Sequence, residues 1–369
     1  MKPIPFFPYP ALYDESRVAF ALAFDAVCGR GAFIMQRELV EFEAQLAEFV
    51  GVKHALGVAD GTVALVIALR ASGLPAGGEV LLPSHTFAAS AAAVHHAGGV
   101  PVLVDCGADH LIDAGKLAAS LTARTAAIMP VQLNGRTADM RALKAFADAH
   151  GLFVVEDAAQ ALGSRFGGRM AGSFGRAGTF SFYPAKLLGC FGDGGAVVTE
   201  DDGVAAAAAS LRDHGRGNDG RVSTWGYNAR LDNLQAAFLL VKMRTFTQSL
   251  ARRRAIAARY HAALSDLPQL QLPPPPAEGT EHYDVFQNYE LCADDRNALR
   301  AFLTERGIGT SLPWGGHMVH EFEKLGCASG NLDASREVLA RFLLLPMHPY
   351  LNDDEVDTIV TAVRSFYGA

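Results

Sequence analysis

The chain has 369 residues, of which 50% are hydrophobic and 19% are charged, so it can form two domains or one large domain with a smaller appendage. Its formal net charge of -7 argues against nucleic-acid binding, which needs a basic surface. Its five cysteines form no CxxC pair, which argues against a disulfide scaffold and a zinc site. We therefore expect a cytoplasmic protein without a bound metal.

Export and membrane insertion are also not expected. Prolines interrupt the first fifteen residues, where a signal peptide would need an apolar helix. Histidines and a glycine pair interrupt the apolar segment 87–106, which is typical of helix, turn and strand and not of a membrane span.

Short apolar runs alternate with helical patterns over the first 200 residues. The runs predict buried strands at residues 56–60, 79–83, 100–105, 125–131 and 152–157. Helices are predicted between them at residues 61–72, 87–97 and 138–150. This alternation predicts an α/β fold with a mostly parallel sheet and helices on both faces, whose ligands bind at the carboxyl ends of the strands.

The second half of the chain predicts a smaller α+β domain. A helical pattern over residues 232–263 leads to the proline-rich linker QLPPPPAEG at residues 271–279. A strand at 284–293, a helix at 296–307 and a strand at 308–314 follow. Asn352 and Glu355 form a capping-box pattern at the start of a last helix, which runs through Ser365. We expect a large domain with an N-terminal arm at residues 1–250 and a small domain at 251–369.

The stretch FSFYPAKLLGCFGDGGAVV, residues 180–198, places one lysine between an apolar run and a glycine-rich turn. Phe180, Phe182 and Tyr183 would desolvate Lys186 and disfavour its ammonium form. A neutral amine is a nucleophile that can form a Schiff base. The alternative is a surface lysine whose ammonium group reaches water.

Other polar groups are expected at neighbouring strand ends. Asp157 ends a buried strand and is either a ligand at the sheet edge or the N-cap of a helix. Gln160 either orients a ligand or is solvated, and Gly61 and Thr62 begin a helix whose free N–H groups suit a phosphate. With Phe87 to stack on a heterocycle, these groups match the needs of pyridoxal 5'-phosphate (PLP). The one GxGxxG string, at residues 215–220, does not follow a predicted strand, and GxxxxGK[ST], HExxH and GxSxG motifs do not occur, which argues against a nicotinamide oxidoreductase and other common enzymes of this fold class.

The chain also resembles a known family. FSFYPAKLLGCFGDGGAVVT, VVEDAAQALGS, GYNARLDNLQAA, LRDHGRG and RGIGTSLPW resemble motifs of the DegT/DnrJ/EryC1/StrS sugar aminotransferases, from about Arg30 to Phe366. This resemblance implies a fold-type I subunit, similar to aspartate aminotransferase, that forms a homodimer with active sites at the subunit interface.

The resemblance also implies roles for individual residues. Lys186 would form the Schiff base and move protons, and Asp157 would pair with the pyridine nitrogen. The remaining cofactor contacts would come from Gly61, Thr62, Phe87, Gln160, Ser181 and the partner's Asn228. The substrate contacts would come from His214, Arg216, Arg230, Trp314 and His320. The chain departs from the family at Asp60, where a small residue or an amide is common, so we exclude Asp60 from the phosphate site.

The implied reaction transfers an amino group from L-glutamate to a nucleotide-linked keto-sugar, for a surface polysaccharide, lipid A or a glycosylated metabolite. The segments FQNYE and PWGGHMVHEFEKLG resemble members that act on 3-keto sugars. Amination at C-4, or of a keto-cyclitol, is the alternative within enzymes. A regulatory or sensor protein on the same scaffold is the alternative from another class, and such a protein is expected to have lost Lys186 or Asp157.

Overall fold

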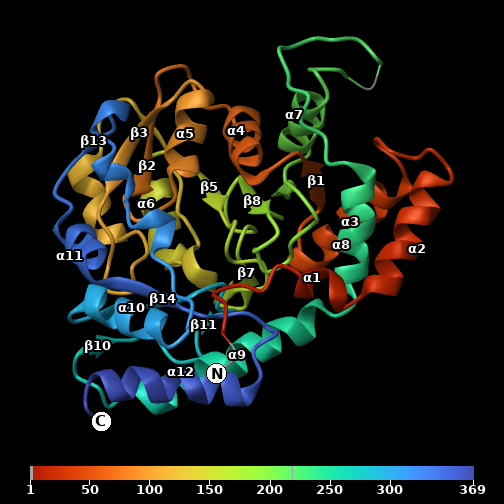
Figure 1. Cartoon of the computed structure of the whole chain (residues 1–369). Coiled ribbons are helices and arrows are strands. Elements are labelled where there is room, and N and C mark those ends of the chain that lie inside the picture. Colours follow the sequence, from red (N-terminus) through yellow and green to blue (C-terminus); the bar gives the residue numbers. More distant parts are fainter. Residues whose placement is uncertain (1–2, 218) are drawn as a thin grey trace.

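An eight-stranded sheet forms the centre of the computed structural model, which describes residues 3–217 and 219–369 (Figure 1). The strand order is β1-β9-β8-β5-β4-β2-β3-β13. The strands are β1 (His54–Val58), β2 (Glu79–Pro83), β3 (Val100–Val104), β4 (Thr125–Ile128), β5 (Phe153–Asp157), β8 (Ala177–Ser181), β9 (Gly195–Thr199) and β13 (Ala328–Ser329). β9 is antiparallel to both of its neighbours, whereas the strands from β8 to β13 in the sheet are parallel. The predicted α/β fold with a mostly parallel sheet is confirmed.

Helices cover both faces of this sheet, as the alternating pattern predicts. One face carries α4 (Gly61–Ala71), α5 (Ala88–His96) and α7 (Asp202–Arg212), and the other carries α3 (Arg37–Val50), α6 (Met140–Ala149) and α8 (Asn233–Met243). Successive side chains of a strand point to opposite faces, so Val80 and Leu82 of β2 pack in one core and Leu81 packs in another. The central strands are therefore buried on both sides, which explains their continuous apolar runs.

The predicted single helix at 232–263 is wrong. α8 ends at Met243, and α9 (Phe246–Leu264) begins after Thr245, whose φ of -117° and ψ of 7° leave the helical region. Neither proline nor glycine occurs at this break, so the sequence pattern reads as continuous. The break lets α9 change direction and reach the second region, at the bottom of Figure 1.

The second region is an antiparallel sheet with helices packed on it. Its strands are β10 (Leu270–Gln271), β12 (Tyr289–Ala293) and β14 (Phe342–Leu345), and its helices are α9, α10 (Arg296–Glu305) and α12 (Asp353–Phe366). The predicted capping box of the last helix is confirmed, because the Asn352 side chain accepts from the Glu355 N–H and the Glu355 side chain accepts from the Asn352 N–H. The predicted strand at 308–314 is wrong. Ser311 forms only an isolated bridge to Leu344, and the strand of this region is β14, to which Leu344 belongs.

Strand pairing joins the two halves of the chain. β13 and the following α11 (Asp333–Arg341) come from the second half, yet β13 pairs in parallel with β3 of the central sheet. At the other end of the chain, Ile4 forms a bridge with Ile308. The division into domains at residue 250 remains a prediction. The remaining elements are α1 (Ala11–Asp14), α2 (Arg17–Cys28) and a small sheet of β6 (Arg165–Phe166), β7 (Arg169–Met170) and β11 (His282–Tyr283).

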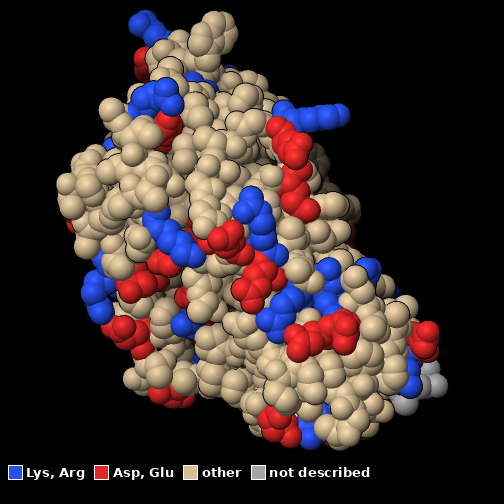
Figure 2. Space-filling view, turned by 90° about the vertical axis from the view of Figure 1, so that its left-hand side faces the viewer, with Lys and Arg blue, Asp and Glu red and all other residues tan. Residues whose placement is uncertain are grey.

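The surface carries both signs of charge. On the face shown in Figure 2, lysine and arginine are interspersed with aspartate and glutamate, and no broad basic area is visible. Within residues 3–217 and 219–369, no helix has the length and apolar character needed to cross a membrane.

Candidate active site

A cavity of about 550 Å³ opens at the carboxyl ends of the parallel strands. Its walls come from the end of β5, the end of β8, the start of α4 and the start of α5. The structure brings together at this cavity the predicted residues Gly61, Thr62, Phe87, Asp157, Gln160, Ser181, Lys186 and Trp314. Segments that are far apart in the sequence therefore meet at one site.

Lys186 lies in the turn between β8 and β9, and its half-buried side chain lines the cavity. The turn is fixed by hydrogen bonds from the Lys186 N–H to the Tyr183 carbonyl (2.8 Å) and from Gln287 Nε2 to the Ala185 carbonyl (2.8 Å). Its amine forms no side-chain hydrogen bond or ion pair with any residue that the structure describes. Burial lowers the pKa of Lys186, and the charge of Asp157 opposes this shift only in part. The amine is thus free and biased toward its neutral, nucleophilic form.

Asp157 ends β5 and is only 5% exposed. Its Oδ2 accepts a hydrogen bond from Ser90 Oγ (2.7 Å), and its Oδ1 accepts one from the Ala159 N–H (3.2 Å). No α-helix starts after Asp157, so the alternative of a helix N-cap does not hold. Burial raises the pKa of Asp157, against the lowering effects of Ser90, the Ala159 N–H and Lys186. A buried carboxylate with so little compensation favours a cationic ligand group beside it.

The start of α4 forms another wall of the cavity. The first N–H groups of a helix have no intrahelical partner, so those of Gly61 and Thr62 are free for an anion. A side chain at Gly61 would place its Cβ 2.7 Å from the Cβ of Ser181, so only glycine allows this approach of α4 to β8. Asp60, which also lines the cavity, is the N-cap of α4 and accepts from the Val63 N–H (2.8 Å). This cap explains why a carboxylate is tolerated at the departure from the family pattern.

Gln160, Phe87 and Trp314 complete the predicted lining. Gln160 Oε1 accepts from the Asn134 N–H (2.8 Å), an arrangement that holds the amide at the edge of the cavity. Phe87 precedes α5 and is 54% exposed, so its ring face is available for stacking. Trp314 reaches the cavity from the second half of the chain and has its ring edge-on to that of His85.

Other predicted residues lie away from the cavity of this chain. The segment between α7 and α8 contains His214, Arg216, Asn228 and Arg230. Its middle part projects at the top of Figure 1, whereas Asn228 and Arg230 form bridges with Asp213 and with Val58 of β1 at its base. Arg230 pairs with Asp213 (2.8 Å) and donates to the Asn228 side chain (2.5 Å). His320 is hydrogen-bonded through Nδ1 to Ser84 Oγ (2.6 Å) and does not line this cavity.

Several polar residues of the site were not predicted from the sequence. Ser90, in the first turn of α5 at the cavity wall, forms hydrogen bonds with both Asp157 and Thr86, each at 2.7 Å. Tyr183, Asp193 and Gln287 also line the cavity. Thr86 and Ser90 are four residues apart, which is helical spacing, but the sequence holds no signal that this helix faces Asp157.

Comparison with known proteins identifies the family. The model of the DegT/DnrJ/EryC1/StrS aminotransferase family matches residues 15–364. The chain belongs to this family. A Streptomyces venezuelae relative named dTDP-3-amino-3,4,6-trideoxy-alpha-D-glucose transaminase is 38% identical over 366 residues, covering 98% of this chain and 96% of that protein. A Geobacillus stearothermophilus relative named pleiotropic regulatory protein is 36% identical over 368 residues, covering 99% and 98%.

The fold agrees with a solved member of the family. The structure of Streptomyces venezuelae DesV, described as being in complex with a ketimine intermediate, superposes with a TM-score of 0.95 at 38% identity, and the match covers 100% of both chains. The predicted fold class and the predicted PLP dependence are thereby confirmed, and this chain is a PLP-dependent aminotransferase.

The cavity fits PLP on its own geometry. Its free amine, buried carboxylate, helix N-terminus and exposed ring suit in turn the aldehyde, the pyridinium nitrogen, the phosphate and the ring face of this cofactor. At the N-terminus of α4, position 61 has no room for a side chain, as expected where backbone N–H groups bind a phosphate directly.

Proposed function

We propose that this aminotransferase moves the amino group of L-glutamate to C-3 of a nucleotide-linked 3-keto sugar, in amino-sugar biosynthesis. The observation that carries the proposal is the free amine of Lys186, in a cavity that also contains Asp157 and the start of α4. The cavity of about 550 Å³ is in the size range of small-molecule sites.

We assign a role in cofactor binding or catalysis to each group near the cavity. Lys186 would bond PLP and, once displaced by an amino substrate, would carry a proton to and from the substrate carbon. Asp157 would keep a proton on the ring nitrogen, while Gly61, Thr62 and Ser181 would hold the phosphate. Bound PLP supplies an electron sink for the carbanion formed at the substrate carbon.

The sugar position is supported by sequence and by a relative. The segments FQNYE and PWGGHMVHEFEKLG resemble members that act on 3-keto sugars, and the Streptomyces venezuelae relative carries a 3-amino sugar in its name. Trp314, from the second segment, lines the cavity and would be a wall of the sugar pocket. His320 bonds Ser84 and does not line the cavity, so its part in the sugar pocket is proposed from the family resemblance alone.

A homodimer is proposed to complete the site. The structure exposes apolar side chains on α2 and α3, on the segment that joins them and on the segment between α7 and α8, and such surfaces commonly form interfaces. These side chains are Val18, Leu22, Phe24, Phe33, Ile34, Met35, Val40, Val222 and Trp225. The partner's Asn228 would reach the phosphate, and His214, Arg216 and Arg230 would lie near the substrate or the interface.

A regulatory role without catalysis is the rival from another class, since one relative is named as a regulator. A protein that had only kept the scaffold would not need a desolvated lysine next to a buried carboxylate. Both groups are present and face one cavity, which favours catalysis over this rival.

The test is an assay of the purified protein with L-glutamate and matched 3-keto and 4-keto nucleotide sugars, with the product identified by NMR. We expect a 3-amino sugar and 2-oxoglutarate, and no product from the Lys186→Ala variant. Asp157→Asn should still bind PLP but turn over far more slowly. Amination only at C-4, or only of a keto-cyclitol, would replace the proposed substrate. A wild-type protein that binds no PLP would overturn the proposal as a whole.

A further inference from the structure

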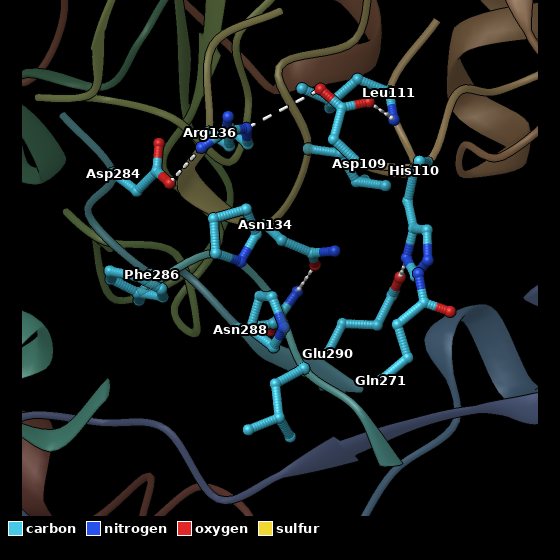
Figure 3. A pocket seen from close by; sticks show the side chains of 15 residues that line it. Asp109, His110, Leu111, Asn134, Arg136, Gln271, Asp284, Phe286, Asn288 and Glu290 are labelled. Atoms are coloured by element: carbon cyan, nitrogen blue, oxygen red, sulfur yellow. Dashed lines mark hydrogen bonds and ion pairs between the residues drawn. The ribbon is translucent and has the colours of Figure 1, made fainter. Parts of the chain in front are cut away.

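A second group of ionisable side chains lies outside the cofactor cavity. His85 and Glu290 are 0% and 3% exposed, and His110 is half-buried beside them. One ligand atom from each of these residues lies within 4.8 Å of the others. Figure 3 shows His110 and Glu290 facing each other at the side of a small cavity, which is separate from the cofactor cavity.

The hydrogen bonds determine which atoms of this cluster are free. His85 Nδ1 lies 3.2 Å from the His110 carbonyl oxygen and must donate to it, because a carbonyl only accepts. In the neutral ring this leaves the lone pair on Nε2, which faces Glu290 Oε2 at 3.5 Å. His85 Nε2 and Glu290 Oε2 are both buried and have no hydrogen-bond partner among the described residues. His110 Nδ1 lies 2.7 Å from Glu290 Oε1 and shares a hydrogen bond with it, whereas His85 Nε2 and Glu290 Oε2 face each other as two acceptors when the His85 ring is neutral.

A buried lone pair beside a buried carboxylate is costly unless a cation lies between them. A metal ion would satisfy the free atoms of His85 and Glu290 together. The Nδ1–H of His85 bonded to a backbone carbonyl is also the usual orientation of a metal-binding histidine.

We propose that His85 Nε2, His110 Nδ1 and the Glu290 carboxylate bind a divalent transition-metal ion of the zinc class, which replaces the proton shared by His110 Nδ1 and Glu290 Oε1. Two histidines and one glutamate form a known zinc ligand set, in which a fourth position stays open. With zinc–ligand bonds of about 2.1 Å, tetrahedral ligand atoms lie roughly 3.4 Å apart, close to the 3.5 Å between His85 Nε2 and Glu290 Oε2.

A water would supply the fourth ligand. The cavity of Figure 3, about 50 Å³ in volume, borders His110 and Glu290 and can hold one. The buried Cys292 Sγ lies 3.8 Å from His110 Nε2, the ring nitrogen opposite Nδ1, so it contacts the histidine and not the ion. Neither the cysteine spacing nor an HExxH motif predicts a metal site, because segments that lie far apart in the sequence form this cluster.

The position of the cluster suggests a structural use. His85 follows β2 and His110 follows β3 of the central sheet, whereas Glu290 belongs to β12 of the second region. The ring of His85 also contacts Trp314, with ring centroids 5.2 Å apart. A bound ion would thus join the two halves of the chain directly behind one wall of the cofactor cavity, and we assign it no part in the amino transfer.

The experiment measures metal binding by the holoenzyme after removal of any histidine tag. Zn²⁺ is titrated against a chromophoric chelator, and we expect one tightly bound ion per chain. Glu290→Gln and His110→Ala should each weaken binding by at least roughly tenfold, the lower end of effects seen when metal-site partners are removed. Mg²⁺, which prefers oxygen ligands, should not compete.

The control is His54→Ala. His54 Nε2 lies 2.6 Å from an Asp202 oxygen at the surface, so this variant removes a histidine–carboxylate pair outside the cluster. It should leave the affinity for Zn²⁺ unchanged. Equal affinity in the wild type and Glu290→Gln would overturn the proposal, as would an equal loss in the control.

A second measurement does not depend on how the variants fold. Co²⁺ added to the wild-type holoenzyme should give the visible bands of a tetrahedral site, at wavelengths longer than the PLP absorption, and Zn²⁺ should abolish them. Absence of these bands, together with substoichiometric Zn²⁺, would overturn the metal site. Either result is independent of the sugar assay.

Discussion

The hydrogen bond from Ser90 to Asp157 offers a sharp test of how the cofactor site is organised. Ser90 is 1% exposed, and its Oγ is 2.7 Å from both Asp157 Oδ2 and Thr86 Oγ1. An ionised carboxylate only accepts, so Ser90 donates to Asp157 and Thr86 must donate to Ser90. Ser90→Ala removes the middle of this chain and leaves the Ala159 N–H, at 3.2 Å, as the protein donor to Asp157.

The expected effect follows from the charge on Asp157. A hydrogen bond to a charged group contributes about 1.5–3 kcal/mol, which corresponds to roughly 10- to 100-fold in an equilibrium constant. The proposed ion pair between Asp157 and the PLP ring would depend on a charged, oriented carboxylate, so PLP affinity should fall by up to this factor. Burial already raises the pKa of Asp157, and the loss of Ser90 should raise it further. The deficit should therefore grow as the pH falls.

The assay is a PLP titration of the apoenzyme, followed by absorbance at several pH values, for wild type and Ser90→Ala. The matched control is Ser72→Ala, because Ser72 is similarly buried at 2% exposure and its Oγ has no hydrogen-bond partner among the residues that the structure describes. Ser90 is a positioning residue, so its signature is the changed pH dependence and not a loss of affinity alone. An unchanged pH profile, or an equal loss in Ser72→Ala, would refute the reasoning.

Three further predictions concern the anion site, the dimer and acid stability. Gly61→Ala would place a Cβ 2.7 Å from a side-chain carbon of β8, so spectroscopic titration should show weaker PLP binding, and normal binding would contradict the cradle. If the partner's Asn228 completes the site, mixed dimers of Lys186→Ala and Asn228→Ala chains should recover about a quarter of wild-type activity, whereas none should return if each chain uses its own Asn228. Burial would raise the pKa of Asp105, but hydrogen bonds from Lys116 and α11 outweigh it and lower the pKa to about 2. A lowered carboxyl pKa stabilises the fold above the ordinary value of 3.8, so the stability difference between wild type and Asp105→Asn in urea unfolding should shrink as the pH falls from 3.8 toward 2.

The sequence was sufficient for the parts of the site that follow strands. Asp157 and Lys186 stand directly after apolar runs, and a parallel sheet brings such positions to one edge. Their alternatives, a helix N-cap and a surface lysine, could be rejected only from the structure. No helix begins at Asp157, and the Lys186 side chain faces the cavity.

The wrong predictions, a single helix at 232–263 and a strand at 308–314, have a common physical cause. Packing between residues that are far apart in the sequence outweighs the local sequence pattern. The break between α8 and α9 has no proline or glycine, and the apolar run 342–345 becomes a strand only by pairing with β12. In the same way, the contact of Ser90 with Asp157 joins positions 67 residues apart, and Glu290 lies 180 residues from His110. A local window of sequence cannot represent such contacts.

The short segment after β2 shows how one stretch of chain can serve several sites. Ser84 bonds His320 of the second region, and His85 turns into the cluster with Glu290. Thr86 begins the chain of hydroxyl groups that ends at Asp157, and Phe87 presents its ring to the cofactor cavity. These four residues are adjacent in the chain, and their side chains point in different directions. A shift of this segment would therefore disturb the cofactor site and the His85–His110–Glu290 cluster together. A metal ion at His85 would therefore stabilise the segment from behind, and the rigidity of Asp157 and the position of Trp314 would depend on the same short stretch of residues.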